Sequence, residues 1–353
     1  MHTECFLYIG TYTSGASKGI YLCRLNSSTG ALTPPELAAE APDPSFLAIH
    51  SADVSKLYAV NEVDFDGNGA LSAFAIDGAS GKLSFLNRTS SCGSGPCHLS
   101  VDATGGCLLA ANFGSGSIVA YRILNDGSLG EAATKIQHAG EHPHAHWIGA
   151  SPFNTFVFVC DLGLDKVLGY RFEAGPGRLI PNVPPFSATR PGAGPRHLAF
   201  HPNGRFAFLI NEYDSSITAF AYDARRGALG EIHTEATLPA GCTGRSSGAA
   251  IEMHPSGKFV YGSNRGHDSI VTFSIDESSG RLTLVGHQPT LGRIPRGFAV
   301  DPTGQWLIAA NQDSDNLVVF RIDTATGRLS PAGHLLEVGA PACVRFHLAQ
   351  RPR

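Results

Sequence analysis

Residues 195–229 of this chain read PRHLAFHPNGRFAFLINEYDSSITAFAYDARRGAL. The stretch holds three short apolar runs, rich in aromatic and β-branched residues, with turn-forming residues between them. Such runs are typical of β-strands rather than helices. They predict strand A at 195–200, strand B at 206–211 and strand C at 217–222. A fourth strand, D, is expected after the tripeptide Gly-Ala-Leu at 227–229.

The tripeptide Gly-x-Leu recurs along the chain about every 50 residues. A fixed period of this size is typical of repeat architectures, so it outweighs the two or three domains that the chain length alone would suggest. Seven units of four antiparallel strands predict one all-β domain, a seven-bladed β-propeller. The seven copies begin at Gly30, Gly81, Gly127, Gly177, Gly227, Gly280 and Gly327.

The two ends of the chain predict how the propeller closes. The first unit has no strand A, because residues 8–11 already resemble strand B. The missing strand is found at the other end, where residues 341–347 read PACVRFH. We therefore expect the C-terminal strand to complete the N-terminal blade, which leaves no open sheet edge. The predicted domain covers residues 5–347, followed by a short C-terminal tail, 348–353.

Composition limits the partners and the compartment. The net charge is −4 and no run of Lys and Arg is present, which argues against nucleic acid as a partner. No apolar stretch is long enough to span a membrane. The first residues lack a basic segment followed by an apolar one, so we expect a cytoplasmic protein. The eight cysteines have no metal-type spacing and fit free thiols in a reducing compartment. Closed sheets need no obligatory partner, so we expect a monomer.

The predicted topology brings the start of strand A and the end of strand B to the same face of the propeller. Strand A of a blade lines the central channel, so its first residues face the axis. Strand B ends in Asn or Asp, which can bond its own backbone two residues later and so start the next turn. These residues are Asn61, Asn112, Asp161, Asn211, Asn264 and Asn311.

Two positions at this face differ from unit to unit, with titratable residues in about half of the units. Structural positions of a repeat should be filled alike, so this variation suggests a functional site. The alternative is a solvated rim with incidental charges. The position about six before the turn proline, or its equivalent, holds Phe46, His98, His146, Arg196, Ala249 and Arg296. The position after the Asn or Asp holds Glu62, Phe113, Leu162, Glu212, Arg265 and Gln312.

The chemistry of these residues points to a small anionic ligand. Three guanidinium groups, those of Arg196, Arg265 and Arg296, offer planar forks that suit a carboxylate or a phosphate. Arginines can also stabilise the oxyanion of acyl transfer. Glu212 and His146 beside them can move protons or orient water. This combination suits the hydrolysis of a small anionic ester or lactone.

Two other motifs are set aside. Residues 244–248 read GRSSG, which matches a serine nucleophile elbow, but a strand at 249–253 follows where that motif needs a helix. His142, His144 and His146 alternate, as metal ligands on one strand face would. A proline interrupts that strand and no fourth ligand can be placed, so we expect no metal, although the sequence leaves the point open.

Several segments together resemble the seven-bladed lactonase family, which contains bacterial propeller-type 6-phosphogluconolactonases and fungal 3-carboxy-cis,cis-muconate lactonizing enzymes. The resemblance runs from about residue 6 to residue 346. It is carried by Tyr8–Thr13 (YIGTYT), Gly194–His197 (GPRH), Asn211–Glu212 (NE), Ser263–Arg265 (SNR) and Pro295–Phe298 (PRGF).

The resemblance implies a lactone enzyme that needs neither a metal nor a cofactor. The lactonizing members are thought to use a His, two Arg and a Glu at the channel mouth. His144 is an alternative to His146, because the sequence HPHAH leaves the alignment ambiguous. The expected catalytic residues are His146, Arg196, Glu212 and Arg265, and the expected substrate-binding residues are Arg296, His144 and His98.

Three functions follow as hypotheses. The leading one is hydrolysis of a sugar lactone, above all 6-phosphogluconolactone to 6-phosphogluconate. The second is the lactonizing isomerisation of a carboxymuconate, which runs similar chemistry in the closing direction. The third is a propeller that binds a ligand or protein without catalysis, since the fold alone does not select a function. Whether Glu212 or His146 is the base stays open at this point.

Overall fold

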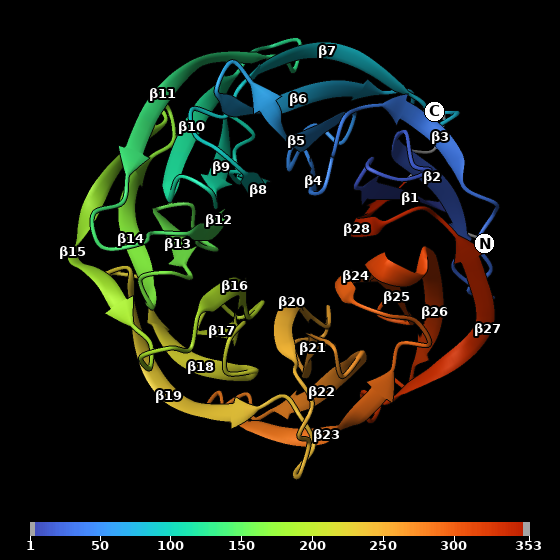
Figure 1. Ribbon diagram of the computed structural model, residues 1–353. Helices are drawn as coiled ribbons and strands as arrows, with labels where there is room; N and C mark the ends of the chain where they lie inside the picture. Colours follow the sequence, from blue (N-terminus) through green and yellow to red (C-terminus); the bar gives the residue numbers. More distant parts are fainter. Residues whose placement is uncertain (1–3, 349–353) are drawn as a thin grey trace.

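A computed structural model describes residues 4–348 and confirms the all-β, seven-bladed propeller. Seven four-stranded antiparallel sheets are arranged in a ring around a central axis (Figure 1). The one helical element among the described residues is the 3₁₀ turn η1 (Gln312–Ser314). In the same part of the chain, no helix is long and apolar enough to cross a membrane.

The strands of each blade follow one another from the channel outward (Figure 1). Blade 1 contains β28 (Pro341–Leu348), β1 (Glu4–Thr11), β2 (Gly19–Asn26) and β3 (Glu36–Glu40). Blade 2 contains β4 (Leu47–Ile49), β5 (Lys56–Phe65), β6 (Asn68–Ile76) and β7 (Leu83–Ser90). Blade 3 contains β8 (Pro96–Val101), β9 (Cys107–Asn112), β10 (Ser117–Ile123) and β11 (Leu129–Gln137). Blade 4 contains β12 (Ala145–Ala150), β13 (Phe156–Asp161), β14 (Lys166–Glu173) and β15 (Arg178–Ala188).

The remaining blades repeat this plan. Blade 5 contains β16 (Pro195–Phe200), β17 (Phe206–Asn211), β18 (Ser216–Asp223) and β19 (Ala228–Ala236). Blade 6 contains β20 (Ser247–Met253), β21 (Phe259–Arg265), β22 (Ser269–Ile275) and β23 (Leu282–Pro289). Blade 7 contains β24 (Pro295–Val300), β25 (Trp306–Asn311), β26 (Asn316–Ile322) and β27 (Leu329–Glu337).

The C-terminal strand closes the ring, as the sequence predicts. Strand β28 pairs antiparallel with β1, with Ile9 opposite Val344 and Gly10 opposite Cys343. Strand β28 continues to Leu348, one residue beyond the predicted end of the domain. The boundaries 5–347 stay a prediction. Residues 1–3, on which the expectation about targeting depends, and residues 349–353 of the predicted tail lie outside the described residues.

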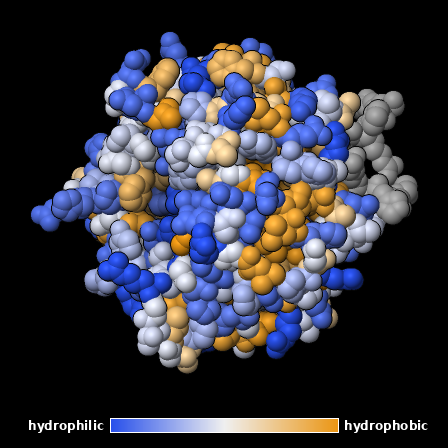
Figure 2. Space-filling view, turned by 45° about the vertical axis from the view of Figure 1, so that its right-hand side comes forward, coloured by the Kyte–Doolittle hydropathy of each residue, from blue (hydrophilic) through white to orange (hydrophobic). Residues whose placement is uncertain are grey.

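The hydrophobic core lies between neighbouring blades. One buried cluster joins Ile9 and Val344 of blade 1 to Ile308 and Leu317 of blade 7, and all four side chains have no exposed surface. Exposed large hydrophobic residues such as Phe85, Val183 and Leu335 are spread over different blades. On the face that Figure 2 shows, hydrophobic residues likewise stand in separate patches among hydrophilic ones.

Contacts between blades explain the repeated glycine. In blade 5, Gly227 has a φ of +60°, and a Cβ there would lie 2.3 Å from Cδ1 of Phe156 in blade 4. A left-handed backbone this close to a neighbouring ring admits only glycine without strain. The carbonyl of the equivalent Gly81 accepts a hydrogen bond from the hydroxyl of Tyr8 in blade 1 at 2.8 Å. The tripeptide therefore marks the place where each blade rests on the preceding one.

The asparagines that end strand B differ from the prediction. Asn112 donates from Nδ2 to the carbonyl of Ser91 at 3.0 Å, and Asn264 donates to the carbonyl of Thr237 at 2.9 Å. Both acceptors lie just beyond strand D of the preceding blade. The expected bond of these asparagines to their own backbone is wrong, because the buried side chains satisfy carbonyls of the connection between blades instead. Asp161 comes nearest to the expectation, accepting from the Leu164 amide at 3.1 Å.

Candidate active site

A β-bulge near the start of strand A positions the residues of the channel mouth. In blade 5, Pro195 pairs with Asn211 and His197 with Ile210, so Arg196 is the extra residue. Bulges re-aim a side chain. The same register shift occurs at Cys97 in blade 3, His146 in blade 4 and Arg296 in blade 7.

The bulge corrects the sequence alignment of two blades. His98 pairs with Ala111 as His197 pairs with Ile210, so Cys97, not His98, is equivalent to Arg196. In blade 2, likewise, Ser45 and not Phe46 is equivalent to Arg196. In the other blades the position is counted back from the proline of the turn between strands A and B. These two blades have no proline in that turn, and the position predicted for them is one residue too far along the chain. His98 therefore lies one residue deeper along strand A than predicted.

Arg196, Glu212 and Arg265 form one ionic cluster. Oε2 of Glu212 lies 2.8 Å from Nε of Arg196 and 2.9 Å from an Nη atom of Arg265. Arg196 is 2% exposed, and its Nη1 also donates to the carbonyl of Ala249 at 2.6 Å. Glu212 thus lies between an arginine of its own blade and one of blade 6. The structure brings together three of the four residues predicted to be catalytic.

The two arginines of this cluster differ in their surroundings. Burial, with the neighbouring charge of Arg265, lowers the pKa of Arg196 to about 9, although Glu212 opposes this shift. Arg196 is still a cation at neutral pH. The Nε–H of Arg265 is buried and has no hydrogen-bond partner among the described residues. A free donor beside a carboxylate-bound guanidinium favours an anionic ligand at this place.

Three buried imidazoles lie next to the cluster. The ring of His197 is 5.1 Å from that of His146 and 5.3 Å from that of His98, between centroids. Burial, followed by nearby positive charges such as Arg196, holds the pKa of all three well below the usual value. They are therefore neutral at pH 7. Nδ1 of His146 is buried without a partner in the described structure, so this imidazole is available for a proton or a hydrogen bond.

His144 lies apart from the ionic cluster. Its ring stacks on Phe113 at 4.5 Å, and its Nδ1 is 2.9 Å from the carbonyl of the same residue. His142 is exposed, with a φ of +56°. Across residues 4–348, no group of three or more His, Cys, Asp or Glu has an arrangement that could hold a metal ion. The alternating histidines thus do not form a metal centre in this structure.

A second carboxylate lies at the mouth. Oε1 of Glu62 accepts a hydrogen bond from the hydroxyl of Tyr12 at 2.9 Å and another from Ser45. The guanidinium of Arg296 lies over the Tyr12 ring, 5.3 Å from its centroid. Burial opposes the charge of Arg296, but Tyr12 and Glu62 together raise its pKa. The variable position after strand B already pointed to Glu62, whereas its contacts with Tyr12 and Ser45 join blades 1 and 2 and have no signal in one sequence.

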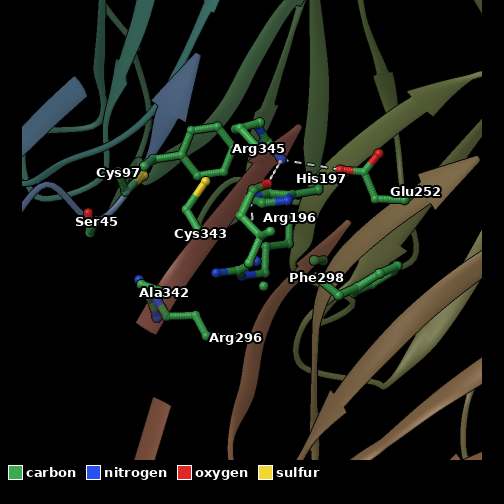
Figure 3. A pocket seen from close by; sticks show the side chains of 14 residues that line it. Ser45, Cys97, Arg196, His197, Glu252, Arg296, Phe298, Ala342, Cys343 and Arg345 are labelled. Atoms are coloured by element: carbon green, nitrogen blue, oxygen red, sulfur yellow. Dashed lines mark hydrogen bonds and ion pairs between the residues drawn. The ribbon is translucent and has the colours of Figure 1, made fainter. Parts of the chain in front are cut away.

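Arg296 stands between two hollow regions. The inner one is a cavity of about 30 Å³ lined by Cys97, Arg196, His197 and Arg296, among others (Figure 3). That volume is enough for water. The outer one is an open pocket of about 540 Å³ that Arg245, Arg265 and Arg296 line. Deeper in the channel, Arg345 and Glu252 form an ion pair at 3.4 Å (Figure 3).

Comparison with known proteins assigns the family. Residues 6–346 match the family model described as lactonase, 7-bladed beta-propeller. The chain belongs to the seven-bladed β-propeller lactonase family. The resemblance noted in the sequence is confirmed, and the chain is a lactonase, an enzyme that hydrolyses a cyclic ester. Its substrate is small, and the positive charge of the site suits an anion.

Similar proteins support this assignment over nearly the whole chain. A 6-phosphogluconolactonase of Bacillus subtilis is 38% identical over 306 residues, which are 85% of this chain and 86% of the relative. A periplasmic gluconolactonase of Pseudomonas aeruginosa has a TM-score of 0.93 and 32% identity, covering 99% of this chain and 100% of the other. A structure from Bacteroides fragilis has a TM-score of 0.90 and 36% identity, covering 98% of each chain.

Proposed function

We propose that this lactonase hydrolyses 6-phosphogluconolactone to 6-phosphogluconate. The observation that carries the proposal is the buried Arg196–Glu212–Arg265 cluster beside a pocket with further arginines. The similarity to the Bacillus subtilis 6-phosphogluconolactonase supports this substrate. A site for this substrate must polarise the lactone carbonyl at one end of the molecule and supply positive charge for the phosphate at the other end.

Arg196 and Arg265 have the chemistry to stabilise the reacting carbonyl. When the oxygen of water bonds to the carbonyl carbon, negative charge develops on the carbonyl oxygen, and a guanidinium donor stabilises that charge. Arg265 has a free Nε–H, and Arg196 is held rigidly by Glu212 and the Ala249 carbonyl. Both donors are therefore positioned before the substrate binds.

Two residues can move the protons of the reaction. A base accepts a proton from the attacking water, the bond from the carbonyl carbon to the ring oxygen breaks, and that oxygen receives a proton. Glu212 is a carboxylate between two guanidinium groups, and His146 is a neutral imidazole with an unpartnered Nδ1. We propose that these two residues share the roles of base and acid, and separate variants of each decide which is the base.

A direct assay tests the proposed substrate. The purified protein is mixed with 6-phosphogluconolactone, and 6-phosphogluconate is measured against the uncatalysed rate; 3-carboxy-cis,cis-muconate is tested in parallel. We expect accelerated opening of the phosphorylated lactone. If the protein only lactonizes the muconate, the proposal is replaced by the lactonizing isomerisation. If neither substrate reacts, a different lactone is the substrate.

Location and assembly stay predictions. All eight cysteines are free thiols, and six of them are buried, which fits the proposed cytoplasmic location. The Pseudomonas aeruginosa relative is described as periplasmic, so cell fractionation is the test. A monomer is proposed from the closed ring of blades, and light scattering of the purified protein measures its mass.

A further inference from the structure

The loop that leads into blade 6 carries an arginine that the ionic cluster does not use. Arg245 is exposed, and no ion pair or side-chain hydrogen bond joins it to another described residue. It lines the outer pocket together with Arg265 and Arg296. Arg265 is paired with Glu212, and the guanidinium of Arg296 lies over the ring of Tyr12. Of the three arginines that line this pocket, Arg245 is the exposed one, and its guanidinium is free to bind a ligand.

The loop is held in a fixed position beside the ionic cluster. Ser246 donates from Oγ to the carbonyl of Arg265 at 3.1 Å, and Arg265 donates to the carbonyl of Gly248 at 3.2 Å. Gly266 has a φ of +93°, and a Cβ there would lie 2.2 Å from the carbonyl oxygen of Arg245. The backbone of Arg245 therefore rests directly on the turn after β21, and its side chain starts from a defined point.

The outer pocket has the size and charge for a sugar phosphate. Its volume of about 540 Å³ lies in the range of small-molecule sites. Three guanidinium groups line it against one carboxylate, Asp313, which accepts a hydrogen bond from Gln312 at 3.3 Å. Ser247 also lines it, and its hydroxyl has no partner among the described residues. The pocket thus offers net positive charge and a free hydroxyl.

We propose that Arg245 and Ser247 form the phosphate subsite of the lactone-binding pocket. The proposal rests on the proposed function: the lactone carbonyl lies at Arg196 and Arg265, and the phosphate lies outward at Arg245. A phosphate monoester carries a charge of roughly −1.5 to −2 and three acceptor oxygens, which match a planar guanidinium fork and a hydroxyl. Arg245 therefore selects phosphorylated over unphosphorylated sugar lactones.

Paired substrates test this selection. The wild type, Arg245→Gln, Arg245→Lys and Ser247→Ala are compared on 6-phosphogluconolactone and on glucono-1,5-lactone. Losing a charged hydrogen bond should lower kcat/KM for the phosphorylated lactone about 10-fold or more in Arg245→Gln, chiefly through KM. The loss for glucono-1,5-lactone should be much smaller, and Arg245→Lys should restore part of the discrimination. Equal losses on both lactones, or no loss on either, would overturn the proposal.

A matched control and a binding measurement complete the test. Arg225 is an exposed arginine on the C–D turn of blade 5, at the opposite face, so Arg225→Gln should leave the discrimination unchanged. If the wild type opens neither lactone, the proposed function fails, and calorimetry with 6-phosphogluconate and gluconate decides the subsite separately. Tighter binding of 6-phosphogluconate that Arg245→Gln abolishes supports it. Equal affinity of the wild type for both acids overturns it.

Discussion

Arg196 donates from Nε to Oε2 of Glu212 across 2.8 Å, from the bulge of β16 to the residue that follows β17. Both residues lie at the channel mouth, at adjacent ends of two neighbouring strands of one blade. Because Arg196 is almost completely buried, its charge depends on this carboxylate. The pair therefore links the stability of the mouth to its chemistry, and variants of either residue must be checked for folding as well as for rate.

Replacing Glu212 by Gln should lower kcat on a competent lactone by about 100-fold or more, the usual scale for a lost proton-transfer group. The amide keeps the shape and an acceptor for Arg196 but removes the negative charge. Steady-state kinetics measure the effect, and a thermal melt monitors folding. Glu131→Gln, on the exposed outer strand β11, is the control. Near-normal turnover in Glu212→Gln would exclude the carboxylate from the reaction.

Replacing Arg196 by Ala should lower kcat/KM by about 100-fold or more, because it removes the buried guanidinium proposed to stabilise the carbonyl oxygen of the lactone. Arg171, exposed on β14, gives the matched control Arg171→Ala, for which no change is expected. If Arg196→Ala folds and keeps at least half of the wild-type rate, Arg196 has no part in catalysis.

The three buried imidazoles predict a loss of stability in acid. The pKa values of His98, His146 and His197 are lower in the folded protein than in the unfolded chain. As the pH falls below the unfolded value near 6.5, the unfolded chain therefore binds more protons, and the free energy of unfolding decreases. Melting temperatures between pH 7 and pH 5 measure this decrease.

A histidine variant tests whether these imidazoles cause the decrease in melting temperature between pH 7 and pH 5. His98→Gln should make the decrease in melting temperature between pH 7 and pH 5 smaller, because one of the three groups no longer titrates. His334→Gln, on the outer strand β27, should leave the slope unchanged. An unchanged slope in His98→Gln would show that the acid sensitivity comes from other groups.

Gly297 should not tolerate a side chain. It follows the bulge residue Arg296, and a Cβ there would lie 2.4 Å from the carbonyl oxygen of Ala342. Gly297→Ala should therefore cost about 1–3 kcal/mol, the usual scale for overpacking, and raise KM by displacing Arg296. Denaturation by urea gives the cost. Gly78→Ala, with nothing within 4 Å of the added carbon, should stay close to the wild type.

Strand β28 should be indispensable for folding. Removing residues 341–353 exposes the edge of β1 and the inner face of blade 1, so the truncated chain should be insoluble or should lack a cooperative melt. Removing residues 349–353 alone keeps every strand of the described residues 4–348 and is the control. A chain without β28 that melts like the full-length protein would contradict the closure.

The fold could be predicted from the sequence because the same turn residues recur at the same places in every blade. Gly227 and its six counterparts are required by backbone conformation and by contact with the preceding blade, so they recur in every unit. Arg196, Glu212 and Arg265 could be located for the same reason, since each stands a fixed distance from a turn proline or a terminal asparagine.

Site residues could not be placed correctly from the sequence where the turn proline is missing, or where the site depends on contacts between different blades. His98 was placed one residue off because its turn has no proline, and His144 lies on Phe113 rather than in the cluster. His197 directly follows Arg196, but one sequence does not indicate its place in the site, because its ring lies beside the imidazoles of His98 and His146 from two other blades. The contact of Tyr12 with Glu62 likewise depends on the packing of blades 1 and 2.

The rate of 6-phosphogluconolactone opening, measured for the wild type and for Glu212→Gln, tests the central claim most directly. We predict that the wild type accelerates opening well above the uncatalysed rate, with kcat/KM of about 10⁴ M⁻¹s⁻¹ or more, and that the variant loses about 100-fold or more of it while melting as a folded protein. A wild type that opens this lactone no faster than the uncatalysed reaction would contradict the account.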